Sequence, residues 1–169
     1  LTKDLLGYLP EEKGLYKKMK AKDLIAFFGG LRGMEPGDAR REAVRLLEKY
    51  GLGEFQDTRC EALSKGMGQK VQVLASVVHK PRFVIFDEPF SGLDPLAVRL
   101  IEALLVEVNH TKGLTMVLTN HHIGSTMRMA DEIVFLVDGI AVTGSVEEMK
   151  ASTDPRIQRF FQAAGTGPS

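Results

Sequence analysis

The most constraining feature of this chain is a short apolar run that ends in two adjacent carboxylates. Residues 83–86 are all apolar, and Asp87 and Glu88 follow them before Pro89. An unbroken apolar run of this length favours a strand buried in a parallel sheet. Because proline cannot donate a hydrogen bond to a neighbouring strand, the strand is predicted to stop at the two acids. Ligands of open α/β sheets bind just beyond such strand ends.

The residues after the acid pair predict a turn that leads into a helix. Ser91 and Gly92 turn the chain, Asp94 is a favoured N-cap residue, and Pro95 fits the first helical position. Two neighbouring carboxylates repel each other, and a bound cation would relieve that repulsion. The pattern therefore favours a nucleotide site that includes a cation. The alternative is that the acids cap a helix or lie in solvent, as a single aspartate after a strand usually does.

Composition excludes several classes of protein. The 169 residues allow one domain, or one domain with an added lobe, and 44% of them are hydrophobic, which is enough for a core. The 22 basic and 22 acidic residues balance, so no nucleic-acid partner is expected. Cys60 is the single cysteine and cannot form an internal disulfide. No apolar run approaches the roughly 20 residues that cross a bilayer, and nothing resembles a signal peptide.

Strands and helices alternate along the chain. Strands are predicted at residues 5–9, 83–86, 114–119 and 133–137, with a hairpin return at 140–142. Apolar residues at helical spacing predict helices at residues 24–31, 38–50, 64–78, 94–108, 123–130 and 156–164. The alternation favours an α/β fold with a parallel sheet, finished by an antiparallel edge.

Local signals mark several of these element ends. Asp38 is the predicted N-cap of the second helix, and Gly51 is its predicted stop. Asp138 followed by glycine is a hairpin signal. Ser145, with Glu148 three residues later, fits a capping box.

The helix that begins after Ser64 has an unusual start. A serine and two glycines, Gly66 and Gly68, open it. Backbone N–H groups point outward at a helix start and the helix dipole favours negative charge, which gives an anion site in principle. The alternative is an ordinary serine N-cap.

Five segments of the chain then carry a resemblance to one family. They are residues 7–11, 63–70, 83–88 and 91–94, followed by His121 after an apolar strand. They resemble, in this order, the Q-loop, the signature motif, the Walker B strand, the D-loop and the switch histidine of the ATP-binding subunits of ABC transporters. Because all five occur in the family's order, the chain is identified as a member of this family over nearly its whole length.

The resemblance implies roles for the residues that would surround ATP and Mg²⁺. Asp87 would hold the metal, as a Walker B aspartate does. Glu88 would polarise the attacking water, and His121 would contact the γ-phosphate. Glu11 stands where the family has a glutamine; a carboxylate there still binds Mg²⁺ but cannot donate a hydrogen bond, and the alternative is a solvated turn residue.

The signature and the D-loop imply a second subunit. Ser64, Lys65 and Gly66 would contact ATP held by the opposite subunit, and Asp94 would act across the same interface. The implied active form is a head-to-tail dimer with two ATP molecules between the subunits. Lys65 replaces the first glycine of the signature and Met67 its glutamine; the lysine adds positive charge near phosphate.

The implied fold is a P-loop NTPase core with a mainly helical lobe. Residues 1–11 would end a core strand and form the Q-loop, 12–80 the helical lobe with the signature helix, 81–150 the α/β core, and 151–169 a tail. No G-x-x-x-x-G-K-[ST] loop occurs in these residues. The family places that loop and further strands upstream, so Leu1 is expected to be a truncation point.

The implied function is ATP hydrolysis that powers transport through a separate membrane permease, on the cytoplasmic face of the cell membrane. Residues 7–16 and 63–72 resemble exporter subunits, whereas residues 151–160 resemble subunits of lipid-trafficking importers, so the substrate stays open. Two alternatives also stay open. One is a soluble ABC ATPase that does not transport, and the other is an inactive fragment unable to bind ATP alone.

Overall fold

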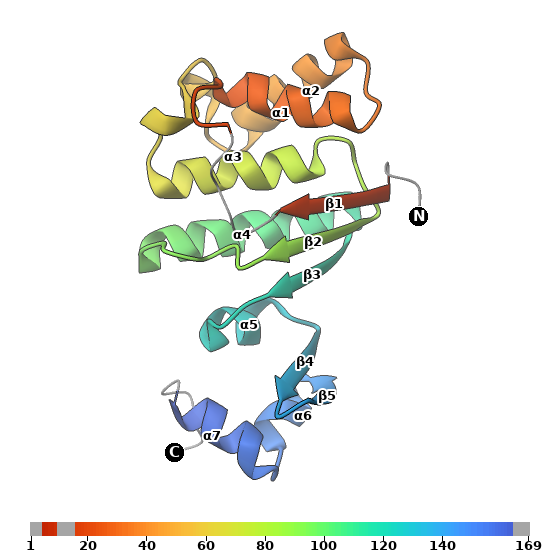
Figure 1. Ribbon diagram of the computed structural model, residues 1–169, viewed down its shortest axis with the longest axis vertical. Coiled ribbons are helices and arrows are strands. Elements are labelled where there is room, and N and C mark those ends of the chain that lie inside the picture. Colours follow the sequence, from red (N-terminus) through yellow and green to blue (C-terminus); the bar gives the residue numbers. More distant parts are fainter. Residues whose placement is uncertain (1–4, 10–15, 164–169) are drawn as a thin grey trace. The chain divides into compact units, whose positions relative to one another are not determined.

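The computed structural model describes residues 5–9 and 16–163. The chain divides into two compact units between Thr119 and Asn120. Figure 1 colours the elements in chain order, from red to blue. Within the described ranges, no helix combines the length and the apolar character that crossing a bilayer requires.

A parallel three-stranded sheet lies in the first unit. β1 (Leu6–Leu9), β2 (Phe83–Asp87) and β3 (Thr115–Thr119) follow one another in that order, and both neighbouring pairs run parallel. The register pairs Asp87 with Thr119 at the carboxyl ends of β2 and β3. The predicted parallel sheet is confirmed, and β2 continues past the apolar run to include Asp87.

Helices cover this sheet in layers. α3 (Lys65–Val77) lies between β1 and the pair formed by α1 (Ala21–Leu31) and α2 (Pro36–Lys49), and α4 (Pro95–Lys112) packs against α3 (Figure 1). Six side chains of α3 and β2 have no exposed surface, namely Val71, Val73, Leu74, Val77, Val84 and Phe86. Burying an apolar side chain of this size stabilises the fold by roughly 1.5–3 kcal/mol.

The second helix starts earlier than the sequence predicted. α2 begins at Pro36 with Glu35 as its N-cap, so the prediction of Asp38 as N-cap is wrong. Proline fixes φ at a helical value and suits the first helical position, and the helix therefore starts there. Asp38 lies in the first turn, where its negative charge still favours the helix dipole.

The segment between α2 and α3 contains two short 3₁₀ turns, at Gly53–Phe55 and Cys60–Ala62. The carboxylate of Asp57 lies between them and accepts hydrogen bonds from the ammonium groups of Lys20 and Lys22, each at 2.8 Å. These bonds lower the pKa of Asp57 to about 2, and the bond from Lys20 has the larger effect. They hold the segment against the start of α1.

The second unit contains a β-hairpin and three helices. β4 (Glu132–Val137) and β5 (Ile140–Ser145) pair antiparallel and form a sheet of their own, and the helices are α5 (Ile123–Met129), α6 (Val146–Ala151) and α7 (Pro155–Ala163). Its core is built from one residue of α5, one of α6 and two of α7: Ile123, Met149, Ile157 and Phe161.

Two local predictions in this unit are confirmed. The hairpin turns at Asp138 and Gly139, whose φ angles of +49° and +75° suit a two-residue turn that needs positive φ at both positions. Ser145 caps α6 with its hydroxyl, and Glu148 accepts a hydrogen bond from the Ser145 amide at 2.7 Å, which completes the capping box and lowers the pKa of Glu148. The domain boundaries suggested by the sequence stay a prediction.

Candidate functional site

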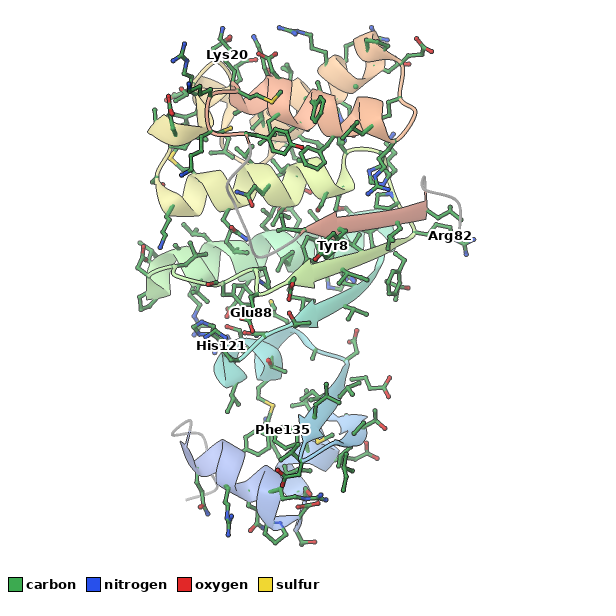
Figure 2. All side chains as sticks on the ribbon, in the orientation of Figure 1. Tyr8, Lys20, Arg82, Glu88, His121 and Phe135 are labelled. Carbon is green, nitrogen blue, oxygen red and sulfur yellow. The ribbon has the colours of Figure 1, made fainter. Side chains whose placement is uncertain are left out.

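The acid pair lies where β2 ends. Asp87 is the last residue of the strand, and Glu88 is the first residue of the turn that follows (Figure 2). The φ angle of Glu88 is +46°, in the left-handed region that residues with a side chain rarely adopt. Its carbonyl accepts a hydrogen bond from the Ser91 amide at 3.0 Å, which closes the turn. The backbone therefore bends sharply at the second of the two acids.

A residue that the sequence did not single out joins the two acids. The hydroxyl of Thr119, the last residue of β3, donates a hydrogen bond to Asp87 Oδ1 at 2.5 Å. The Glu88 amide donates to Thr119 Oγ1 at 3.1 Å and to the Thr119 carbonyl at 3.2 Å. Asp87, Glu88 and Thr119 are called the strand-end corner below. One feature of the sequence could have pointed to Thr119. It is a hydroxyl residue at the end of the strand predicted to follow β2 in the parallel sheet.

The residues predicted from the signature motif lie at the start of α3. Ser64 is the N-cap, and its hydroxyl accepts a hydrogen bond from the Met67 amide at 3.2 Å. A Cβ atom on Gly66 would lie 3.1 Å from the Cβ of Ala97, in the first turn of α4. Because real Cβ contacts are seldom this short, Gly66 allows the two helix starts to approach each other.

The residues predicted to form the D-loop lie beside this helix start. Asp94 caps α4, with its carboxylate accepting from the Ala97 amide at 2.9 Å. The Lys65 ammonium donates to the carbonyl of Gly92 at 2.8 Å, and Gly92 has a φ of +67°. The structure thus brings Lys65 and Gly66 together with the D-loop turn. We call the starts of α3 and α4 with this turn the helix-start pair.

Ser64, Lys65 and Asp94 are exposed in the described part of the chain, whereas Gly66 is half-buried. The Ser64 and Asp94 side chains serve as N-caps here, as the alternative interpretation of Ser64 expected. Their predicted contacts with a second subunit's ATP stay a prediction.

Glu11 and His121 are the two remaining site residues that the sequence predicted. Glu11 lies outside the described residues. His121 belongs to the second unit, just before α5, where its ring lies 4.6 Å from that of His122. The Asn120 carboxamide accepts from the His122 amide at 2.7 Å and fixes this turn. The roles of Glu11 and His121 stay predictions.

The acid pair fits a metal ion that is shared with a substrate. Among residues 5–9 and 16–163, no group of three or more His, Cys, Asp and Glu side chains forms a protein cage for a metal. Mg²⁺ is commonly held by one or two carboxylates together with water and substrate phosphates. Asp87 and Glu88 supply that kind of donor set at the end of β2.

One family model and two relatives show which known proteins this chain resembles. Residues 1–91 match the family described as "ABC transporter". An uncharacterized ABC transporter ATP-binding protein of Alkalihalophilus pseudofirmus is 38% identical over 150 residues, which cover 88% of this chain and 56% of that protein. The lipopolysaccharide export system ATP-binding protein LptB of Acidithiobacillus ferridurans is 29% identical over 157 residues, which cover 92% of this chain and 64% of that protein.

Solved structures show the same fold. The ADP conformation of MJ1267, an ATP-binding cassette of an ABC transporter, superposes with a TM-score of 0.78 at 16% identity, covering 94% of this chain and 68% of that one. The chain spans about half the length of the first curated relatives, at 56%, 49% and 55%.

Proposed function

Because this chain belongs to the ABC transporter ATP-binding family, we propose that it supplies the site at which such a transporter hydrolyses ATP. The observation that carries this proposal is the strand-end corner. Two adjacent carboxylates stand at the carboxyl end of a central parallel strand, and contacts from the neighbouring strand hold them. In open α/β sheets this position is where ligands bind.

The two acids have different tasks in this proposal. Asp87 holds Mg²⁺, which when bound neutralises charge on the phosphates. Glu88 orients and polarises the water that attacks the γ-phosphate, for which it must come within hydrogen-bond distance of that water. The positive φ of Glu88 supports this division, because the backbone there departs from the extended conformation that Asp87 has in β2.

The helix-start pair serves a second subunit in this proposal. Ser64, Lys65 and Gly66 contact ATP bound by the opposite subunit, and Asp94 acts across the same head-to-tail interface. The exposed position of Ser64, Lys65 and Asp94 supports this role. The outward N–H groups at the start of α3 favour a phosphate there.

We further propose that the hydrolysis powers transport through a separate membrane permease, with the chain on the cytoplasmic face of the membrane. The relatives support this part. One is named a lipopolysaccharide export system ATP-binding protein, and another a linearmycin resistance ATP-binding protein.

The test uses the gene product that contains residues 1–169, at its encoded length. Glu88→Gln keeps the shape of the side chain and removes the base. ATP hydrolysis is expected to fall about 10²- to 10⁴-fold, whereas ATP binding measured by calorimetry is retained and the ATP-bound dimer accumulates. Glu54→Gln, an exposed glutamate on the 3₁₀ turn after α2, is the matched control. Hydrolysis by Glu88→Gln at the parent rate would contradict the proposal.

A further inference from the structure

Thr119 connects both members of the acid pair through one oxygen atom. A threonine hydroxyl has a single hydrogen to donate and two lone pairs to accept with. An ionised carboxylate only accepts, so the hydroxyl hydrogen is directed at Asp87 Oδ1, 2.5 Å away. The lone pairs then remain for the Glu88 amide, 3.1 Å from Oγ1. Both hydrogen bonds are satisfied by one orientation of the hydroxyl.

The bond to the Glu88 amide acts at a strained point of the backbone. A left-handed φ costs energy for residues with a side chain, and it persists where surrounding contacts require it. Two acceptors of Thr119, its carbonyl and its hydroxyl, bind the Glu88 amide. The carbonyl belongs to the backbone of β3 and is present with any residue, whereas the hydroxyl is specific to the threonine side chain.

The sheet register explains why this residue can reach both acids. Asp87 and Thr119 are register partners at the ends of adjacent parallel strands. Thr119 is exposed in the described part of the chain, so packing in a core does not fix the orientation of its side chain. Its hydroxyl contacts Asp87 and the amide of Glu88.

We propose that Thr119 is a positioning residue whose hydroxyl orients the Asp87 carboxylate and holds the bent backbone at Glu88, so that both acids are aimed before ATP arrives. This proposal rests on the proposed function for its effect on the reaction. Partners that hold metal-binding carboxylates in place commonly change metal affinity or activity 10- to 100-fold when they are removed.

The chain offers substitutions that separate the hydroxyl from the shape of the side chain. Thr119→Val has nearly the same shape and suits a strand, but it lacks the hydroxyl. Thr119→Ser keeps the hydroxyl and loses only the methyl group. Thr115→Val makes the same chemical change at the first residue of β3, which is exposed on the same face and pairs with Phe83.

The first measurement needs no nucleotide. Hydrogen exchange of the Glu88 amide is followed in the chain of residues 1–169, together with its urea unfolding midpoint. Thr119→Val is expected to speed exchange at Glu88 about 3- to 10-fold, the effect of losing one hydrogen bond, with the midpoint unchanged. Thr119→Ser and Thr115→Val are expected to exchange at the parent rate.

The second measurement is ATP hydrolysis by the gene product that contains the chain. Thr119→Val is expected to lower kcat about 10- to 100-fold and to raise the Mg²⁺ concentration needed for half-maximal rate, with Thr119→Ser restoring both. Three results would overturn the proposal: unchanged Glu88 exchange in Thr119→Val, equal effects of Thr119→Val and Thr115→Val, or a parent rate of hydrolysis in Thr119→Val. If the parent itself fails to hydrolyse ATP, the proposed function fails, and Glu88 exchange still decides whether the Thr119 hydroxyl holds this turn.

Discussion

The two N-caps of the helix-start pair and the strand-end corner are built from different kinds of contact. The caps Ser64 and Asp94 each bind an amide three residues further along the chain. Thr119 instead binds residues that precede it by 31 and 32 positions. Local caps form wherever their helix forms, whereas the strand-end corner requires β2 and β3 to be paired in register.

The difference also predicts how each region responds to change. A cap can be removed with the loss of one local hydrogen bond. A shift of β3 along β2 would separate Thr119 from both acids at once, because one register sets all three positions. Removing the caps of the helix-start pair should therefore change the free energy of unfolding additively, one cap at a time.

The largest expected effect in the helix-start pair comes from added bulk where the start of α3 approaches the start of α4. Gly66→Leu must place side-chain atoms against Ala97 of α4, where a Cβ would already lie 3.1 Å away. Overpacking of this kind costs about 1–3 kcal/mol of the free energy of unfolding. Urea unfolding of the parent chain and of Gly66→Leu measures this loss.

Gly68→Leu is the matched control on the same helix. A Cβ on Gly68 has no neighbour within 4 Å, so the change should stabilise α3 by up to about 1 kcal/mol through helix propensity. Equal effects of the two substitutions would show that the approach of α3 to α4 does not depend on Gly66.

Removal of the caps should have a smaller, local effect. Ser64→Ala and Asp94→Ala each leave helix-start amides without their side-chain acceptor, which costs about 1 kcal/mol per cap. The double variant should lose the sum of the two within about 0.5 kcal/mol, because the caps serve different helices. Unfolding free energies of the two single variants and the double variant measure this. A coupling well above 0.5 kcal/mol would make the helix-start pair a cooperative unit like the strand-end corner.

The smallest expected effect lies outside both regions, at the exposed ion pairs of Asp57. Its folded-state pKa of about 2 is below the ordinary value of 3.8, because Lys20 and Lys22 bind its charged form. Its contribution to stability is therefore present above about pH 4 and is lost as the pH falls toward 2. Between pH 2 and pH 5, the urea unfolding midpoint of Asp57→Asn should change slightly less with pH than that of the parent.

Salt provides the control for this prediction. At about 1 M salt the Debye length is roughly 3 Å, and exposed pairs are largely screened. The difference between the parent and Asp57→Asn should then shrink. A difference that is undiminished in salt would mean that Asp57 acts through something other than its charge.

Much of the fold was predictable because its signals are local. The apolar run before Asp87 predicted β2, the Asp94 and Pro95 pair predicted the start of α4, and Ser145 with Glu148 predicted the capping box. The N-cap of α2 was predicted wrongly because two good local signals competed, and Pro36 prevailed over Asp38.

The candidate site was predictable only in part. The sequence identified Asp87 and Glu88 by their position after an apolar run, and the resemblance identified the signature and D-loop residues. Neither indicated that Lys65 binds the Gly92 carbonyl or that Thr119 binds both acids. These partners are 27 to 32 residues apart, and no local periodicity relates them.

The sequence by itself determined most of the elements, the caps of α4 and α6, and the acid pair, because helix and strand signals act over a few neighbouring residues. The tertiary structure alone decided which residues hold those acids. Register places Thr119 opposite Asp87, and the bend at Glu88 is maintained by atoms of another strand. Hydrogen bonds depend on distances of about 3 Å between groups, and only the packed sheet sets those distances for residues far apart in the chain.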